Sequence, residues 1–438
     1  MRPTFRFGRG IVLRRAALPC VLATLTLLLP WALAFDPQAW LVWGRDLPGS
    51  GLTTADGPSW KPLPLLFTTP LALAGDLAPS LWLILARTGA FVALGGAWRL
   101  GRMLVGRTAA LGAVGVTALG PWWAYNAALG NSEGWLAAFV LWAIVAHLER
   151  RERLAFVLLA GAGLLRPEIW PFLLGYGAWT WRRGSRALVA GGAVVIVVAW
   201  FGPDVVWSAG AISARDTARG TASPGSAGNA DHPALQVLAD AATGVGIAAC
   251  VAVAFAAWRR PLAQVLALLA VAYVVLVAVA TFAGYAGNPR YLVPAIAVFA
   301  VLAGVGAAAL PWPRLGVAAL LVLTLVAHAG ELRAAGRDVA ARSETRDGLD
   351  EAIRLSGGAA RLRACGPLRT VFLTRALVAL RTGAPLPGIA RLRAGPGTTL
   401  LPPPASVLQD QQPIPRRGPD EQALAVRAGG WSVWSSCR

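Results

Sequence analysis

Charged residues and metal-binding residue types are scarce in this 438-residue chain. Only 14% of the residues are charged, and there are four cysteines and three histidines. His147, His232 and His328 are scattered and the cysteines form no cluster, so a zinc site has little support. The sequence also lacks a glycine-rich loop followed by Lys-Ser or Lys-Thr, which argues against a bound nucleotide. We therefore expect no cofactor, with a divalent ion between Asp36 and Glu133 as an unsupported alternative.

Lysine is almost absent, because Lys61 is the only lysine among the 40 basic residues. The dominance of Arg, Ala, Gly, Leu and Val is typical of a high-GC bacterial genome. In so Arg-biased a sequence, a compact ammonium can serve where a planar guanidinium cannot. Lys61 is therefore a candidate functional residue, and the chance survival of one lysine is the alternative interpretation.

Apolar residues dominate the sequence: 56% of the chain is hydrophobic and the mean hydropathy is +0.58. Many apolar runs approach the ~20 residues that a helix needs to cross the bilayer. We predict an all-α polytopic membrane protein with about eleven crossings. The expected spans lie near 14–34, 78–98, 108–124, 134–148, 154–166, 169–181, 187–202, 236–257, 262–283, 292–310 and 315–330.

The net charge of +19 lies mostly in arginine clumps between the apolar runs. Because such clumps mark cytoplasmic loops, they predict a cytoplasmic N-terminus and an extracytoplasmic C-terminus in a bacterial plasma membrane. Topology thus accounts for the basic charge, so we expect membrane lipids and no nucleic acid as partners. The clumps lie near 2–15, 99–107, 149–153, 182–186, 259–260 and 314.

Two domains are expected. Residues 1–330 form the polytopic membrane domain. Residues 331–438 are rich in Arg, Gly and Pro without a long apolar run, and we expect a small extracytoplasmic α/β domain there. Cys365 and Cys437 are the only cysteines of this part, and two cysteines in an outward-facing domain predict a disulfide. Two free thiols are the alternative.

Polar residues recur on the side of the membrane that is predicted to face outward. Asp36 ends the first span and Glu133 opens the fourth. Arg166 and Glu168 occupy the turn of a short apolar hairpin, 154–181, whose two arms are too short to cross fully. Charges below the membrane surface are costly unless they face protein or water. We therefore infer a water-filled cavity that opens to the outside.

Four further residues join these candidates. Arg290 and Tyr291 open the tenth span, Asp204 lies at another outward turn, and Arg87 lies inside the second span, where snorkelling is the structural alternative. The cations suit a membrane-anchored phosphate, and a carboxylate suits a general base acting on a hydroxyl or amine. An acid such as Asp36 can also simply mark the membrane interface.

The order of these features resembles the glycosyltransferase C superfamily, in the branch of the protein O-mannosyltransferases and the lipid A aminoarabinose transferase. In that branch an acid ends the first span, a Lys/His-Pro-Pro-Leu segment follows, and another acid opens the fourth span. Four further features complete the pattern: a run of small residues that contains Arg, a Leu-Gly-Arg stretch, a basic residue in the short hairpin, and an Arg-Tyr-x-x-Pro motif. The matching positions are Asp36, Lys61-Pro62-Leu63-Pro64, Arg87, 100–107, Glu133, Arg166, Arg290-Tyr291 and Pro294, within about 35–310.

The resemblance implies a polyprenyl-phosphate sugar as donor and a glycan, lipid or protein of the cell envelope as acceptor. Asp36-Pro37 replaces the Asp-Glu pair of the protein O-mannosyltransferases, which argues against protein acceptors. A hexosyl or pentosyl group would move by one inverting displacement, with Asp36 as base and Glu133 orienting the acceptor or Asp36. The implied donor-phosphate residues are Lys61, Arg166, Arg290, Tyr291 and Arg87, and the implied acceptor residues are Glu168 and Asp204.

Two other classes of protein would also suit the pattern. A transporter or flippase of a lipid-linked or anionic substrate places charges along a cavity too. Transporters commonly have repeated halves, and the sequence has no visible internal repeat. A non-catalytic envelope assembly protein, whose outer domain binds a partner, is the third alternative.

Overall fold

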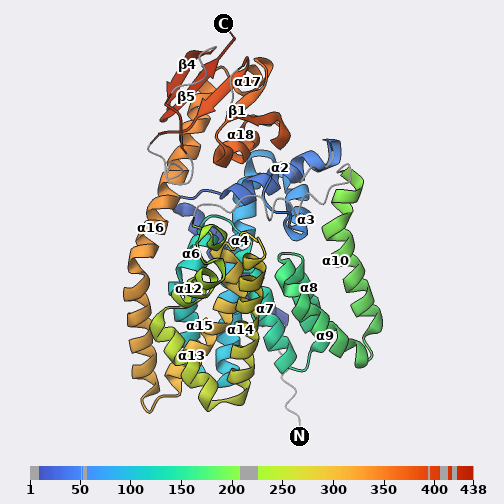
Figure 1. Cartoon of the computed structure of the whole chain (residues 1–438), viewed down its shortest axis with the longest axis vertical. Coiled ribbons are helices and arrows are strands. Elements are labelled where there is room, and N and C mark those ends of the chain that lie inside the picture. The colour runs from blue at the N-terminus through green and yellow to red at the C-terminus, as the bar shows by residue number, and fades with distance from the viewer. Residues whose placement is uncertain are drawn as a thin grey trace.

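Helices make up the membrane part of the protein, and a small sheet domain caps one end of it (Figure 1). The computed structural model describes residues 9–50, 52, 57–207, 225–392, 395–404, 413–416 and 422–437. The sheet domain lies at one end of the molecule, beyond α2 (Figure 1). The membrane-part helices are α1 (Arg9–Leu25), α2 (Phe35–Ser50), α3 (Pro62–Leu71), α4 (Ala78–Leu104), α5 (Arg107–Leu119), α6 (Pro121–Ala128), α7 (Glu133–Leu148), α8 (Glu152–Gly163), α9 (Trp170–Arg182), α10 (Arg186–Trp207), α12 (Pro233–Val245), α13 (Ile247–Arg259), α14 (Pro261–Phe282), α15 (Val293–Ala308) and α16 (Pro313–Leu355).

The protein is a multi-pass membrane protein, as the sequence predicts. Within the described ranges, five helical stretches are long and apolar enough to cross a bilayer, or six if α12 and α13 count as one bent span. Shorter apolar helices stand beside them, including α5 and α7. The helices α8 and α9 have 12 and 13 residues, shorter than a straight span requires, so the number of about eleven crossings stays a prediction.

Helix α15 forms the centre of the bundle, with 94% of its most apolar stretch buried against other helices. Small residues let its neighbours come close: a Cβ on Gly304 would lie 2.3 Å from the Ala113 nitrogen of α5. By contrast, only 22% of the apolar stretch of α16 is buried, and side chains such as Leu323 and Val326 are exposed. Those exposed apolar faces suit contact with lipid.

One predicted span differs in the structure. The run 236–257 is not one straight helix, because α12 and α13 meet at Gly246 with a bend of 90°. Gly246 has φ +86°, a left-handed conformation that other residues adopt at a cost, so the glycine ends one helix and lets the next begin. Apolar composition alone gave no sign of this turn.

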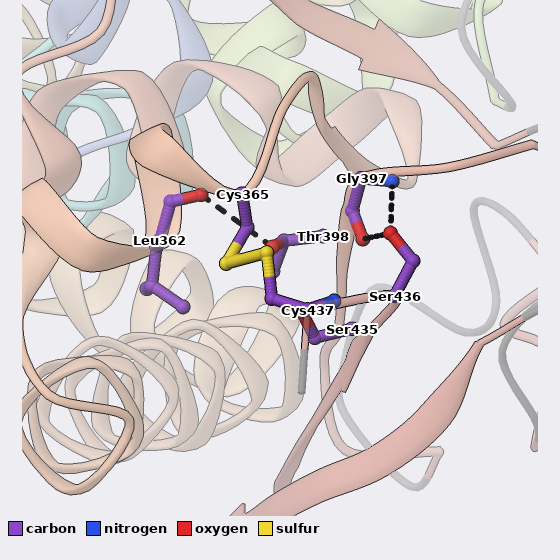
Figure 2. The surroundings of a disulfide bond; sticks show 7 residues. All are labelled: Leu362, Cys365, Gly397, Thr398, Ser435, Ser436 and Cys437. Carbon is purple, nitrogen blue, oxygen red and sulfur yellow. Dashed lines mark hydrogen bonds between the residues drawn. A yellow bond between two sulfur atoms is a disulfide. The ribbon is translucent and has the colours of Figure 1, made fainter.

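The C-terminal domain is small and mixed α/β, as expected, and α16 runs into it without a break at residue 330. Its sheet has the strand order β2-β1-β3-β5-β4, with β1 parallel to β2 and β3 and the other pairs antiparallel. Its elements are α17 (Ala359–Ala364), β1 (Leu368–Thr370), η6 (Phe372–Thr374), α18 (Arg375–Thr382), β2 (Ile389–Arg391), β3 (Thr398–Leu401), β4 (Ala423–Ala428) and β5 (Trp431–Ser435). In the structure Cys365 and Cys437 are joined by a disulfide (Figure 2).

Several contacts fix this domain to the membrane part. Arg45 of α2 donates to the carbonyl of Ala384 at 2.7 Å, and the rings of Phe35 and Phe372 lie 5.3 Å apart. Within the domain, Trp431 of β5 donates its indole N–H to the Thr345 carbonyl of α16 at 2.8 Å, which joins the sheet to the helix that enters from the membrane part. The domain therefore rests directly on α2.

Replacing Cys365 by serine should destabilise the C-terminal domain by about 2–5 kcal/mol, because the disulfide joins residues 72 positions apart and restricts the unfolded chain. The measurement is the temperature at which protease cleaves the domain in detergent-solubilised protein. Cys250→Ser removes a free thiol in α13 and is the matched control. Equal cleavage temperatures for both variants would contradict the stabilising role.

Candidate functional site

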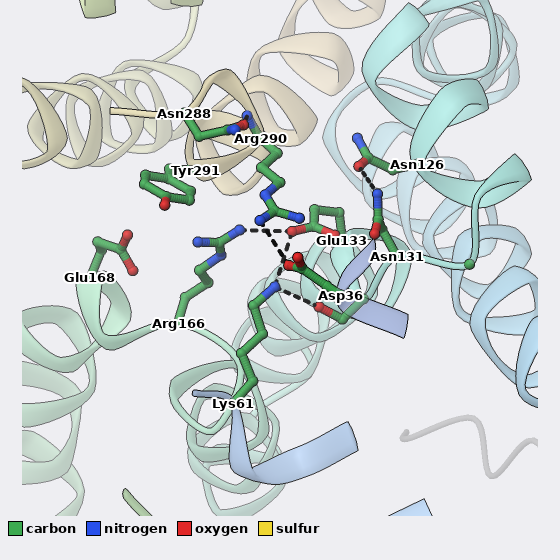
Figure 3. Close-up of polar contacts among 12 residues, drawn as sticks. Asp36, Lys61, Asn126, Asn131, Glu133, Arg166, Glu168, Asn288, Arg290 and Tyr291 are labelled. Carbon is green, nitrogen blue, oxygen red and sulfur yellow. Dashed lines mark hydrogen bonds and ion pairs between the residues drawn. The ribbon is translucent and has the colours of Figure 1, made fainter. Parts of the chain in front are cut away.

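Five charged residues that the sequence singles out meet in space, although they come from distant segments (Figure 3). Each lies at or next to the start of a helical segment: α2, α3, α7, η3 (Pro167–Ile169) or η5 (Pro289–Leu292). We call these residues the central cluster: Asp36, Lys61, Glu133, Arg166 and Arg290.

Proline sets the local backbone of two cluster residues. Lys61 precedes Pro62 and Arg166 precedes Pro167, and a residue before proline favours an extended backbone. Both residues are extended, with φ/ψ of −141°/114° and −147°/122°, and the proline then starts a helical turn. Each side chain therefore leaves the chain just ahead of a helix and reaches sideways into the cluster.

Glu133 holds two buried cations with one carboxylate oxygen. Its Oε1 accepts a hydrogen bond from Arg166 Nη2 at 2.7 Å and lies 3.3 Å from Lys61 Nζ. Lys61 Nζ also donates to the hydroxyl of Ser132 at 3.1 Å. The three charged side chains are at most 2% exposed, so the ion pairs lie out of contact with bulk water. Removing one partner would leave an unpaired buried charge, which is strongly unfavourable.

Asp36 pairs separately with Arg290. Arg290 Nη2 lies 2.7 Å from Asp36 Oδ2, and the Arg290 side chain is 21% exposed. The backbone N–H of Arg290 donates to Asn288 Oδ1 at 3.1 Å, which caps η5 and fixes the start of this segment. The cluster thus has two parts, one around Glu133 and one around Asp36.

Aromatic rings support the two deepest cations. Lys61 Nζ lies 5.2 Å from the centroid of the Trp40 ring, and the Arg166 guanidinium lies 4.1 Å from that of Tyr291. Such contacts stabilise a desolvated cation through the negative face of the ring. Tyr291, an expected member of the site, therefore lies beside the cluster.

Glu168 lies next to the cluster and has a different partner. Its Oε1 accepts a hydrogen bond from the hydroxyl of Tyr285 at 3.0 Å, and Tyr285 packs against Tyr291 with ring centroids 5.0 Å apart. Tyr273 donates its hydroxyl to the Tyr291 carbonyl at 3.0 Å. These contacts join the Glu168 turn, η5 and α14 into one wall of the site.

The unpaired donors of the central cluster suit binding of an anion. Within the cluster three cations face two carboxylates, and Glu168 beside it adds a third negative charge, so the donors rather than the net charge select the ligand. Within the part of the chain that the structure describes, the buried Nε atoms of Arg166 and Arg290 have no hydrogen-bond partner. Buried donors normally have acceptors, so the pattern suits a ligand rich in acceptor oxygens.

A divalent metal fits these residues poorly. Asp36 and Glu133 already contact cationic side chains, which compete with a metal for the same oxygens. Over the described ranges, no group of three or more His, Cys, Asp and Glu residues could hold a metal ion.

Two expected site residues are placed elsewhere or lack a described side chain. Arg87 donates to the carbonyls of Thr26, Ala127 and Ala128, so it ties α4 to η1 and to the end of α6 rather than joining the cluster. Asp204 belongs to α10, but its side chain lies outside the described residues.

The sequence reasoning missed a pair of buried amides beside the cluster. Asn131 Nδ2 donates to Asn126 Oδ1 at 2.9 Å (Figure 3). Asn126 Nδ2 in turn donates to the Trp122 carbonyl at 2.6 Å. Asn131 lies two residues before Glu133, a predicted site residue, and this proximity in sequence could have indicated that it belongs to the site. Asn126 and Tyr285 had no comparable signal in the sequence.

An apolar cavity of about 600 Å³ lies between α7, α8, α9, α14 and α15. It reaches the site through Tyr273 and through Ile169, the neighbour of Glu168. Further along, side chains such as Leu159, Phe172 and Leu269 line it. Its walls suit a hydrocarbon chain, and the central cluster stands near one end.

Comparison with known proteins identifies the fold of this chain through its likeness to solved structures. No family model and no curated protein matches the sequence. Two crystal structures of ArnT from Cupriavidus metallidurans match with a TM-score of 0.59 and 15% identity. The apo structure is matched over 97% of both chains, and the structure bound to undecaprenyl phosphate over 98% of both. The resemblance drawn from the sequence is thus confirmed as a likeness of fold, and the chain has the fold of ArnT.

Proposed function

We propose that this protein is a glycosyltransferase that takes a sugar from a polyprenyl-phosphate donor and transfers it to a cell-envelope acceptor on the extracytoplasmic face. The observation that carries the proposal is the central cluster, three cations around two carboxylates near an apolar cavity. The ArnT fold supports it, because one matching ArnT structure is bound to undecaprenyl phosphate.

The donor phosphate would bind to Lys61, Arg166 and Arg290. Guanidinium groups form strong charge-assisted hydrogen bonds with phosphate oxygens, and Nε of Arg166 and Arg290 has no partner within the described chain. The polyprenyl chain would lie in the apolar cavity beside α9 and α14. Tyr291 holds the Arg166 guanidinium by a ring contact, so we assign it a supporting role.

Asp36 would act as the general base. It would take the proton from an acceptor hydroxyl or amine while that oxygen or nitrogen bonds to the anomeric carbon. The bond from that carbon to the phosphate oxygen breaks, and its electron pair leaves with the phosphate. The three cations would stabilise the departing charge, and a single displacement inverts the anomeric configuration.

Glu133 would act as a positioning residue. It contacts Lys61 and Arg166 directly, so we assign it to holding these cations rather than to orienting the acceptor or Asp36. Glu168 and Asp204 are proposed for the acceptor.

The extracytoplasmic placement is supported by two features. The disulfide Cys365–Cys437 suits an oxidising compartment, and the domain that contains it rests on α2 beside Asp36. Arginine clumps such as Arg259–Arg260 are expected on the opposite, cytoplasmic side. We therefore propose that the donor reaches the cluster from within the membrane and that the acceptor reaches it from outside.

Asp36→Asn should reduce sugar transfer by roughly 100-fold or more, because the amide cannot accept the proton. The measurement is label transfer from a radiolabelled polyprenyl-phosphate sugar in membranes that carry the variant. Asp347→Asn alters an exposed aspartate on α16 and is the matched control. Full transfer by Asp36→Asn would refute the base assignment, and lipid movement without transfer by the wild type would indicate a flippase.

Lys61→Arg should lower kcat/KM by about tenfold or more, because the planar guanidinium cannot replace a compact ammonium packed among Ser132, Glu133 and Trp40. The reverse exchange Arg99→Lys, at an exposed pair with Glu149, is the control and should leave the kinetics unchanged. Unchanged kinetics in Lys61→Arg would mean that the single lysine has no special role.

A further inference from the structure

The two carboxylates of the central cluster hold different cations. Glu133 holds Lys61 and Arg166, whereas Asp36 pairs with Arg290. In Figure 3 Arg290 reaches the cluster from the segment that contains Asn288, on the opposite side from Lys61. The proposed base and one proposed phosphate ligand are therefore each other's partners.

This pairing sets two proposed roles against each other. The Arg290 guanidinium lies 2.7 Å from Asp36 Oδ2, so it occupies one of the two carboxylate oxygens that could take a proton from the acceptor. Arg290 Nη2 is likewise not open to a phosphate oxygen while it contacts Asp36. The Asp36–Arg290 pair therefore occupies one oxygen of the proposed base and one nitrogen of a proposed phosphate ligand.

We propose that the donor phosphate competes with Asp36 for Arg290, so that donor binding releases Asp36 to act as base. The inference rests on the proposed function, because it takes a lipid phosphate as the ligand of the cluster. It makes the reaction ordered: the acceptor is activated only when a donor is in place.

Exposure and packing identify Arg290 as the cation that can exchange partners. Its side chain is 21% exposed, against 2% for Lys61 and Arg166, and Tyr291 additionally holds Arg166. Its backbone is fixed by the Asn288 cap, so the guanidinium can turn while η5 stays in place. Its Nε has no hydrogen-bond partner in the described structure and can donate to a phosphate oxygen.

If Asp36 and the phosphate compete for Arg290, replacing Asp36 changes the affinity for the lipid phosphate. If the Asp36–Arg290 pair only holds α2 and η5 together, that affinity should not rise. Removing the charge of Asp36 frees Arg290 in advance, so the inactive variant should bind the lipid phosphate more tightly than the wild type. Coupling between two ligands of one group typically changes affinity by a factor of about 5 or more. The gain should vanish when Arg290 is also replaced, because nothing then remains to be freed.

The experiment is a double-mutant cycle on undecaprenyl phosphate binding to full-length protein in nanodiscs. The wild type, Asp36→Asn, Arg290→Gln and the double variant are compared by dissociation constant, each after its unfolding temperature is shown to match the wild type. We expect Asp36→Asn to bind about fivefold tighter or more. We expect no such gain from Asp36→Asn in the Arg290→Gln background.

Glu168→Gln is the matched control for removing a buried negative charge. Glu168 accepts a hydrogen bond from Tyr285, and any change in affinity on its replacement should persist when Arg290 is replaced. If Arg290→Gln does not fold, Arg290→Lys takes its place, since the shorter side chain cannot present two guanidinium donors and the gain should shrink.

The outcomes separate this inference from the proposed function. Absence of undecaprenyl phosphate binding to the wild type would count against the proposed function itself. Wild-type binding without a gain in Asp36→Asn would show that the pair is only a brace between α2 and η5. An equal gain with and without Arg290 would show general charge repulsion, and either of these two results overturns the competition.

Discussion

The site depends on one carboxylate that balances two buried cations. Glu133, at the first residue of α7, contacts both Lys61 and Arg166, and all three side chains are at most 2% exposed. Cations removed from water to this degree need a counter-charge, so the loop before α3 and the turn before η3 are bound to the same point. The distant segments of the site are thereby held together without relying on flexible surface contacts.

Around that point the fold separates an apolar space from a charged one. The cavity between α7, α9 and α14 has apolar walls, whereas the cluster near its end contains three cationic side chains. A molecule with a long hydrocarbon chain and a phosphate head has the same division. This complementarity, rather than any single residue, connects the ArnT fold to the proposed donor.

Four members of the cluster could be predicted because each is a charge at the predicted outward end of an expected span, and Lys61 could be predicted because it is the only lysine in the sequence. Arg87 looked similar in sequence, but within the described residues its guanidinium donates to backbone carbonyls and one threonine hydroxyl. The sequence could not reveal which cation pairs with which carboxylate, because these pairings depend on how segments far apart in the sequence pack together. Asn126 was missed because nothing in its sequence neighbourhood marked it. The bend at Gly246 was missed because apolar composition carries no information on the direction of a helix.

The most direct measurement of the central claim is a cryo-electron microscopy structure of the protein in nanodiscs with undecaprenyl phosphate. We predict the phosphate within hydrogen-bond distance of Lys61 Nζ and the Arg166 and Arg290 guanidinium groups, about 3 Å, with the chain in the apolar cavity. A phosphate bound elsewhere, with the cluster unchanged, would contradict the account and leave the five charges as a structural network.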